Sequence, residues 1–339
     1  MSAARVAILG VAHTPHAMSY TRCLAEREDV ELVGVYDSDA ALGGRVADRF
    51  GIPYTANLDQ LLGGELAAAV VCSKTIEHRA IVEQTAGAGV HVLCEKPLAT
   101  TLADGRAMID ACNAAGVQLH AAFVCRFYPV VQQVRAAVAA GAIGDVIGIV
   151  GGNRGIAPLP PSYPSWITDK VEAGGGALID HSVHVTDAIR HVIGREVVSV
   201  NAEIDDRFWK AGVDDLAILS LVLDGGAIAS VDPSWSVPSS NPWHYDFFLR
   251  VLGTRGALDI DDTKESVRFV DAAGLHLVTF GVDIDRLMVD AFLDSVRRGA
   301  MIDPCADGED GYRALEIALA GYEAAASADT VRLDDFRRR

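Results

Sequence analysis

The chain has 339 residues, with 29 Lys and Arg against 46 Asp and Glu, and its formal net charge at pH 7 is −17. Nucleic acids and anionic membrane surfaces are therefore poor partners, because both would repel the chain on average. Half of the residues are hydrophobic and 22% are charged, which excludes intrinsic disorder and, at roughly 100 to 200 residues per domain, predicts two globular domains.

Short, almost wholly apolar runs alternate with amphipathic stretches in the first third of the chain. Strands are predicted at 6–9, 31–36, 68–72, 91–94 and 117–123, and helices at 15–28, 40–50, 77–88 and 102–115. This alternation is typical of a parallel sheet with helices on both faces. It predicts a doubly wound α/β domain, which binds ligands outside the carboxyl ends of its strands.

The first strand-to-helix turn begins at Gly10, which matches the first position of the Gly-x-Gly-x-x-Gly pattern of dinucleotide-binding turns. Ala12 and Pro15 replace the other two glycines. Thr14 is predicted to cap the helix that Pro15 starts, and a phosphate can bind at that helix N-terminus. Further donors in the turn are His13 and His16. An ordinary strand-to-helix turn is the alternative interpretation.

Asp37 ends the second apolar run, near the place where an acidic residue binds the adenosine ribose hydroxyls in dinucleotide-binding domains. An acid there would also repel a 2′-phosphate, and no Arg follows it immediately. The sequence therefore favours NAD over NADP. The alternative role for Asp37 is that of a solvated strand-end or helix N-cap residue.

Lys96 lies in the segment Glu95-Lys96-Pro97, at the carboxyl end of a predicted strand. Pro97 restricts Lys96 to extended geometry, so its ammonium is held on a stiff stem. Beside a cofactor, such a lysine can hydrogen-bond a substrate hydroxyl and lower its pKa. A surface lysine without chemical function is the alternative.

A glycine-rich helix start runs from Gly174 to Asp187. Asp180 and His184 are four residues apart and share one helix face, where a carboxylate can orient an imidazole and raise its basicity for general base catalysis. Metal ligation and a plain ion pair are the alternatives, and the dispersed Cys and His residues do not support a metal site. The neighbours assigned to structure are His181, Asp187 and His191.

Together these segments resemble the glucose-fructose oxidoreductase / inositol dehydrogenase / MocA (Gfo/Idh/MocA) family of nicotinamide-dependent oxidoreductases. The resemblance rests on Cys94-Glu95-Lys96-Pro97, the Gly174 to Asp187 run and Arg126-Phe127-Tyr128-Pro129. It also includes the runs 89–93 and 141–145, and it extends over most of the chain.

The resemblance implies a Rossmann NAD-binding domain at 1–125 and an α+β domain at 126–339 with a large open, mostly antiparallel sheet. Apolar runs at 146–151, 197–204, 217–223, 227–235, 246–252 and 257–260 fit the strands of such a sheet. Because the open apolar face would be a liability if exposed, we expect it to be covered in a homodimer or homotetramer.

The resemblance also implies residue roles. Lys96 would polarise the reacting hydroxyl, His184 would remove its proton, and Asp180 would bind the imidazole and the substrate. Ser73, Lys74, Thr75 and His78 occupy a segment that lies near the nicotinamide and ribose in the family, but Lys74 and Thr75 depart from the family's Pro and Asn. The residues expected to bind the cofactor are Gly10, Ala12, His13, Thr14, Pro15, His16, Asp37, Ser73, Lys74, Thr75, His78, Glu95 and Lys96.

The expected function is NAD-dependent oxidation of a secondary hydroxyl of a sugar, sugar derivative or inositol. The alternatives are a lyase or glycosidase that uses NAD for transient oxidation and elimination, and a non-catalytic sensor of dinucleotide and ligand. Besides Lys96, Asp180 and His184, the residues expected to bind substrate are Arg126, Asn153 and Trp166, while Arg154, Tyr163, Trp235, Trp243 and Tyr245 also suit a sugar ring. Arg126 is equally compatible with a structural role.

No apolar run reaches the roughly 18 residues of a membrane helix, and the N-terminus is too short for a signal peptide before the first strand. The six cysteines are dispersed, which is typical of buried thiols in a reducing compartment. A cytoplasmic enzyme is therefore expected.

Overall fold

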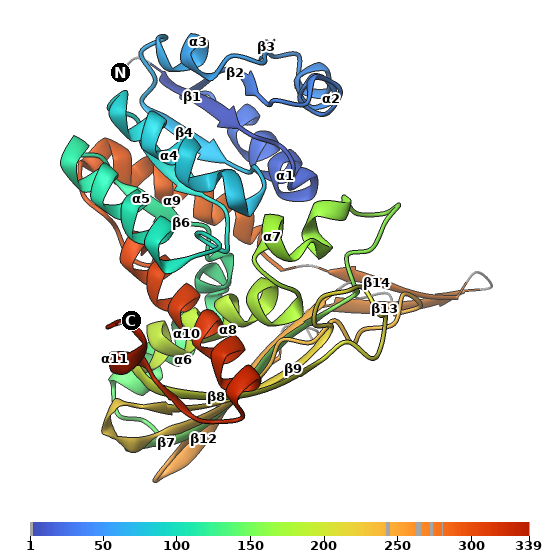
Figure 1. The fold of residues 1–339 in the computed structure, drawn as a ribbon, viewed down its shortest axis with the longest axis vertical. Helices are drawn as coiled ribbons and strands as arrows, with labels where there is room; N and C mark the ends of the chain where they lie inside the picture. The colour runs from blue at the N-terminus through green and yellow to red at the C-terminus, as the bar shows by residue number, and fades with distance from the viewer. Residues whose placement is uncertain (1–2, 242–244, 262–265, 272–273, 280, 339) are drawn as a thin grey trace. The chain divides into compact units, whose positions relative to one another are not determined.

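The computed structural model describes residues 3–241, 245–261, 266–271, 274–279 and 281–338 (Figure 1). The chain divides into two compact units. The first unit consists of Met1–Val124, Val171–Gly174 and Ile284–Tyr312, and the second of Cys125–Lys170, Gly175–Asp283 and Arg313–Arg339. Each unit contains one large sheet and its own buried core.

The sheet of the first unit has the strand order β15-β6-β5-β4-β1-β2-β3. Its strands are β1 (Ala4–Leu9), β2 (Val30–Tyr36), β3 (Tyr54–Thr55), β4 (Ala68–Val71), β5 (His91–Cys94), β6 (Leu119–Ala121) and β15 (Ala306–Asp307). The first six pair in parallel, and β15 adds an antiparallel edge next to β6. The central strands β1 and β4 are buried on both faces, which explains their continuous apolar runs.

Helices cover both faces of this sheet (Figure 1). On one side α4 packs against α5, and on the other α1 packs against α2 and α9. The helices are α1 (Thr14–Ala25), α2 (Ala40–Phe50), α3 (Leu58–Leu62), α4 (His78–Gly87) after the short helix η1 (Thr75–Glu77), α5 (Leu102–Ala115) and α9 (Ile284–Arg298). The predicted doubly wound α/β fold is therefore confirmed.

Local signals determine where two of these helices begin and end. Asp39 and Thr101 accept hydrogen bonds from the first-turn amides of α2 and α5, and Gly51 and Gly116 end these helices with a positive φ. The prediction that Thr14 caps α1 is wrong. The helix begins at Thr14 itself, its N-cap residue is His13, and the cap makes no side-chain hydrogen bond, while the Thr14 hydroxyl donates to the Val11 carbonyl at 3.1 Å.

The C-terminal segment 284–312 belongs to the first unit, although the sequence prediction assigned it to the second domain. Helix α9 packs on α1, where Ser19 donates to Asp285 at 2.5 Å and Arg27 pairs with Asp290. Arg297 extends this contact to Asp29 at 2.5 Å. The hydrogen bond and the two ion pairs each join residues more than 260 positions apart in the chain, and helical periodicity carries no information over that separation.

The sheet of the second unit has the order β12-β11-β7-β10-β9-β8-β16. Its strands are β7 (Val146–Gly155), β8 (Val197–Asp205), β9 (Leu216–Leu223), β10 (Ile228–Asp232), β11 (Tyr245–Gly253), β12 (Gly256–Asp261) and β16 (Val331–Arg332). All neighbours are antiparallel except β7 and β10, so the predicted open, mostly antiparallel sheet is confirmed. Strands β13 (Ser266–Asp271) and β14 (Gly274–Thr279) form a separate hairpin.

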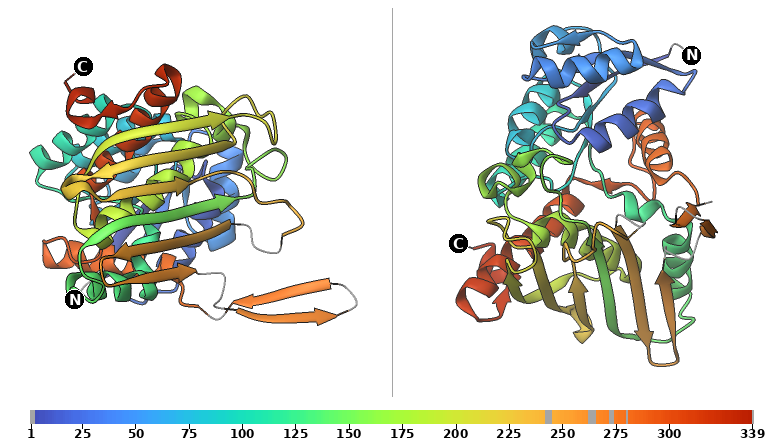
Figure 2. Two further views of the ribbon diagram at one scale, coloured as in Figure 1. Left: turned by 90° about the horizontal axis from the view of Figure 1, so that it is seen from below. Right: turned by 90° about the vertical axis from the view of Figure 1, so that its right-hand side faces the viewer.

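One face of the second sheet is packed and the other is open. Residues of β9 alternate between buried and exposed, and α8 packs on β7, β9 and β10. Figure 2 (left) looks onto the face that no helix covers in the described part of the chain. The remaining helices are η2 (Val124–Phe127), α6 (Pro129–Ala139), η3 (Ser165–Thr168), α7 (Lys170–Ala173), α8 (Ala177–Ile193), η4 (Asp224–Gly226), α10 (Gly308–Ser327) and α11 (Leu333–Phe336). No described helix is long and apolar enough to span a membrane.

Candidate functional site

In the first unit the turns that follow β1 and β4 are in direct contact. Gly10 has a φ of 75°, and a Cβ built there would lie 2.4 Å from the Cβ of Ser73. Only glycine combines this backbone conformation with this close approach. The glycine therefore allows the turns after β1 and β4 to approach closely at the carboxyl edge of the sheet.

Asp37, which follows β2, is hydrogen-bonded to the turn after β1. Its Oδ2 accepts from the Val11 amide at 2.7 Å, and its Oδ1 accepts from the Asp39 amide at 2.8 Å. The carboxylate is buried. The predicted ribose contact of Asp37 remains a prediction, and the structure adds a second role, which is to fix the conformation of the turn after β1.

A buried carboxylate lies behind this turn. Glu95 accepts from His16 Nδ1 at 2.9 Å and from the Lys96 amide at 3.0 Å, and the Tyr20 hydroxyl also donates to it. Only 1% of the Glu95 side chain is exposed, against 32% for His16. The ring of His13 stacks on that of His16 with centroids 3.9 Å apart. Glu95, predicted as a cofactor contact, is therefore positioned to act through His16 rather than by direct contact.

The charges of this cluster support one another. Although burial alone would raise the pKa of Glu95, the charges of His16 and His13 and the hydrogen bonds from His16 and Tyr20 hold it far below its ordinary value. Burial alone would lower the pKa of His16, but the charge and hydrogen bond of Glu95 raise it above its ordinary value. The geometry thus favours a carboxylate paired with an imidazolium.

Lys96 follows Glu95 and is buried. In the neighbouring segment, Lys74 pairs with Glu172 at 2.5 Å, and Thr75 begins a short helix that leads into α4. His78 is fully buried, with Nδ1 3.1 Å from the Leu98 carbonyl and Nε2 3.3 Å from the Ser73 carbonyl. The predicted cofactor contact of His78 is therefore wrong, because both ring nitrogens face carbonyls inside the unit.

In the second unit, the glycine run before α8 accommodates an unusual helix start. Asp214 accepts from the amides of Gly176 and Leu178 at 3.0 and 2.7 Å, and it accepts from the Tyr322 hydroxyl at 2.8 Å. A Cβ at Gly176 would lie 2.1 Å from the Asp214 carbonyl oxygen. Asp214 thus caps α8 from outside the helix, and the glycines make room for it.

Asp180 lies in the first turn of α8, where Trp235 and His181 contact it. Its Oδ2 is 3.1 Å from the indole nitrogen of Trp235, which donates to it, and 3.2 Å from His181 Nε2. His184 is on the same helix and is buried. The contact with Asp180 is compatible with the structural role assigned to His181, and Trp235, which follows β10 in a loop, reaches the same carboxylate. No sequence signal predicts the contact with Trp235, because the two residues are 55 positions apart.

Two residues that were predicted to contact the substrate, Arg126 and Asn153, make hydrogen bonds within the second unit. Arg126 donates through two nitrogens to Asp187 at 2.6 and 2.8 Å, and both side chains are buried. Asn153 is buried on β7, and its amide nitrogen donates to the Asp246 carbonyl at 2.7 Å. The bidentate pair with Asp187 supports the structural alternative for Arg126. The substrate contact of Asn153 stays a prediction, because this bond uses one amide hydrogen only. The structural role of Asp187 is confirmed.

The other predicted ring-binding side chains differ in exposure. Trp166 is buried in η3, and Arg154 pairs with Asp246 at 2.5 Å while lying over the ring of Phe248. Trp243 and the side chain of Tyr245 lie outside the described residues. The substrate contact of Trp166 stays a prediction.

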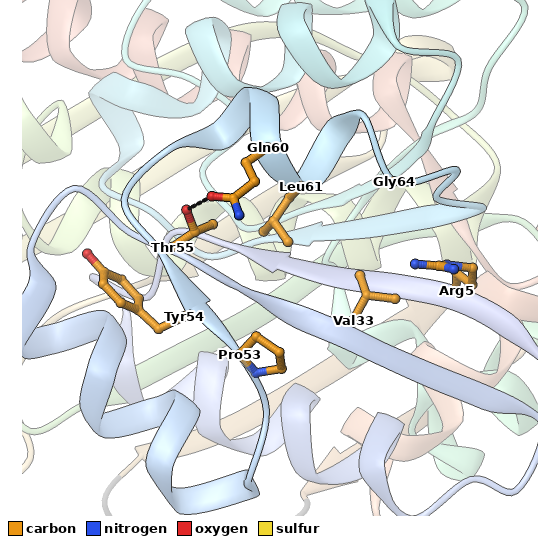
Figure 3. Close-up of a pocket in the computed structure, with 8 residues that line it drawn as sticks. All are labelled: Arg5, Val33, Pro53, Tyr54, Thr55, Gln60, Leu61 and Gly64. Carbon is orange, nitrogen blue, oxygen red and sulfur yellow. Dashed lines mark hydrogen bonds between the residues drawn. The ribbon is translucent and has the colours of Figure 1, made fainter.

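A separate groove crosses the first sheet under α3 (Figure 3). Thr55 donates to Gln60 at 2.8 Å on one side, and the Arg5 guanidinium lies at the other end. The residues that line it are Arg5, Val33, Pro53, Tyr54, Thr55, Gln60, Leu61 and Gly64. None of them belongs to the turns described above, so the groove is distinct from the candidate cofactor site. Within the described ranges no cluster of three or more His, Cys, Asp or Glu side chains could hold a metal ion.

Comparisons with known proteins match both parts of the chain. Residues 4–123 match the model of an oxidoreductase family with an NAD-binding Rossmann fold, and residues 131–259 match the GFO/IDH/MocA C-terminal domain. D-glucoside 3-dehydrogenase of Escherichia coli is 31% identical over 97% of each chain. Myo-inositol 2-dehydrogenase of Thermotoga maritima is 29% identical over 79% of this chain and 80% of its own.

Among solved structures, GenD2 from gentamicin A biosynthesis, determined in complex with NAD, has a TM-score of 0.87 to this chain. It is 24% identical, and the match covers 98% of this chain and 97% of that protein. At this identity the likeness establishes the fold.

Proposed function

The chain belongs to the GFO/IDH/MocA family of oxidoreductases, with an NAD-binding Rossmann domain, and on this basis we propose that it oxidises a secondary hydroxyl of a sugar, sugar derivative or inositol. One observation carries the proposal. Lys96 follows β5 in the first unit, Asp180 and His184 both lie on α8 in the second, and all three residues stand in the motifs that resemble those of the family.

The NAD turn of this chain keeps the elements of a dinucleotide site. Gly10 allows the close approach to Ser73, Asp37 is available at the end of β2, and α1 begins directly after the turn. NAD, when bound, supplies the nicotinamide that accepts a hydride. Asp37 also disfavours the 2′-phosphate of NADP, because two like charges would be brought together.

We assign the proton chemistry to three side chains. The Lys96 ammonium donates to the substrate hydroxyl and favours its ionisation through its positive charge. His184 accepts the hydroxyl proton as the carbon-bound hydrogen leaves with its electron pair. Asp180, oriented by the Trp235 indole, stabilises the protonated imidazole and the substrate. The products are a ketone, a reduced cofactor and one proton.

A panel of sugars, sugar acids and inositols with NAD and with NADP tests the function by absorbance of the reduced cofactor. For the best substrate, His184→Ala should lower turnover by roughly 10² to 10⁴ and leave NAD affinity nearly intact. His191→Ala is the matched control on the same helix, where the ring contacts Gln132. Unchanged turnover in His184→Ala would refute the assigned base.

A double-mutant cycle of Lys96→Met with His184→Ala tests whether the two residues act on one hydroxyl. If they do, the combined loss is much smaller than the product of the single losses, because the residues act as a unit. Losses that multiply would contradict a shared reacting group.

The same assay separates the alternatives. Net formation of NADH accompanies oxidation, whereas transient oxidation with elimination cleaves a neighbouring bond without net NADH. A non-catalytic sensor would bind a sugar and NAD and show no turnover with any compound, so that substitution of Lys96 would change binding only.

We also propose that the open face of the second sheet is covered by another copy of the chain. Five aliphatic side chains lie exposed on β7, β9 and β10: Ile147, Val150, Ile218, Val222 and Ile228. A contiguous apolar face of this kind marks an interaction surface in soluble proteins. Light scattering should give a dimer or tetramer, and Ile228→Lys should weaken it. A wild-type monomer at micromolar concentration would contradict this proposal.

A further inference from the structure

The turn that should hold the pyrophosphate of NAD has few backbone donors to offer. The amide of Gly10 donates to the Tyr36 carbonyl at 2.7 Å, that of Val11 to Asp37, and that of His13 to the Cys72 carbonyl at 2.9 Å. Pro15 has no amide hydrogen. Among the described residues the structure gives no acceptor to the amides of Thr14 and His16. The turn therefore commits several of its amides to acceptors within the unit, which leaves few for a doubly charged pyrophosphate.

We propose that His16, held as an imidazolium by Glu95, is the cation that binds the pyrophosphate of NAD, so that cofactor affinity depends on pH. This inference rests on the proposed function only in taking NAD as the ligand. It assigns a charge to a residue of the turn and names the group that maintains that charge.

The pairing with Glu95 favours a positive charge on His16. A carboxylate with 1% of its side chain exposed is costly unless a cation and hydrogen bonds compensate it, and the His16 ring is 2.9 Å away. The other donors to Glu95, the Lys96 amide and the Tyr20 hydroxyl, are neutral. The imidazolium is therefore the charged hydrogen-bond partner of this buried carboxylate.

The orientation of His16 leaves one side of the ring for a ligand. Nδ1 faces Glu95, while 32% of the side chain is exposed, and among the described residues the hydrogen bond of the ring is made through Nδ1 and not through Nε2. His16 is in the first turn of α1, where the helix dipole adds positive potential. Nε2–H can thus donate to a phosphate oxygen while Nδ1–H donates to Glu95.

The other groups around His16 do not reverse its charge. Lys96 opposes protonation, whereas Asp285 in the first turn of α9 favours it, as does Glu95. The His13 ring stacks on His16, and the Tyr20 ring lies 5.8 Å away. Together these neighbours raise the pKa of His16 above its ordinary value despite its burial.

The sign of the pH dependence follows. The pyrophosphate diester keeps its charge across neutral pH, so His16 is the titrating partner. Affinity for NAD should be highest below the raised pKa of His16 and should fall as pH rises through it. A charged hydrogen bond of this kind is worth about tenfold in dissociation constant.

Titration calorimetry of NAD on the full chain from about pH 6 to pH 9 tests this. His16→Gln should weaken binding about tenfold at the acidic end and abolish the pH dependence. His16→Lys should restore affinity without pH dependence, because its charge is permanent in this range. His91→Gln, at the opposite end of β5, is the matched control and should titrate like the wild type.

Two probes identify the ligand group. ADP-ribose contains the pyrophosphate without the nicotinamide and should show the pH dependence of NAD, whereas adenosine should show none. A wild-type affinity that does not change with pH, or a His16→Gln loss that is equal at every pH and is not rescued by His16→Lys, would overturn the inference. Both outcomes leave the dehydrogenase proposal standing, since NAD still binds.

Discussion

The two units each contain a histidine paired with a carboxylate, and the pairs differ in origin and exposure. In the first unit, Glu95 and His16 come from segments 79 positions apart, and 1% of the carboxylate side chain is exposed. In the second unit, Asp180 and His181 are adjacent on α8, and their side chains are 20% and 14% exposed. In the first pair the carboxylate is buried and its charge is held by hydrogen bonds, whereas in the second pair both side chains are partly exposed.

The largest expected effect is a loss of turnover when the charge of Asp180 is removed. Asp180→Asn keeps the shape of the side chain and removes the negative charge that we propose stabilises protonated His184. Turnover should fall by roughly 10² to 10⁴ while NAD affinity stays constant. Steady-state kinetics with calorimetry of NAD check this. A loss confined to NAD affinity would place Asp180 with the cofactor instead.

A third pair, Arg126 with Asp187, is buried on both sides and gives a purely structural reference. Arg126→Met leaves the Asp187 carboxylate buried without its main cation and should lower the free energy of unfolding by about 3–5 kcal/mol. Denaturant unfolding measures the change. If Arg126 bound substrate, the Michaelis constant would rise and stability would change little.

Glu95→Gln should show how much the charge of Glu95 contributes to the stability of the first unit. The neutral side chain leaves poorly matched donors around it, and stability at neutral pH should fall by about 1–3 kcal/mol. Because the folded-state pKa of Glu95 is depressed, its contribution exists above the unfolded-state pKa and is lost as pH falls. The difference between variant and wild type should therefore narrow in acid, which urea unfolding at several pH values would detect.

Trp235→Phe is a milder change in the second pair. It removes the indole donor to Asp180, at 3.1 Å, and keeps the buried aromatic volume. We expect a loss of about 0.5–1.5 kcal/mol in stability and a shift in the pH profile of turnover. An unchanged profile would mean that the indole does not orient the carboxylate.

The smallest effect concerns stability in alkali. The pKa of His16 is raised on folding, so its stabilising contribution is complete below the unfolded-state pKa and is lost as pH rises through the folded-state pKa. His16→Gln should flatten this part of the pH dependence of unfolding. A wild-type curve that is already flat there would contradict the pairing with Glu95.

Much of the first unit could be predicted from the sequence because its signals are local. The bounds of α2, α5 and β5 agree with the prediction, since caps, left-handed glycines and apolar runs mark them within a few residues. Strand β3 and helix α3 escaped prediction because two and five residues are too few for a period to appear.

The candidate site was predictable only in its residue types. Lys96, Asp180 and His184 follow from short motifs, but the partner of Glu95 does not, nor does the contact of Trp235 with Asp180, because these pairs join distant segments. Arg126 illustrates the limit. The sequence left open whether it binds a ligand, and the position of Asp187, 61 residues later, decided for a structural pair.

The sequence by itself determined the alternation of strands and helices, the cofactor class and the candidate side chains for the chemistry, because periodicity and motif spacing are properties of a few neighbouring residues. The tertiary structure decided which of those side chains are buried, which carboxylate each histidine meets, and that α9 returns to the first unit. Burial and long-range approach set the charge of a group, and both arise only when the chain has folded.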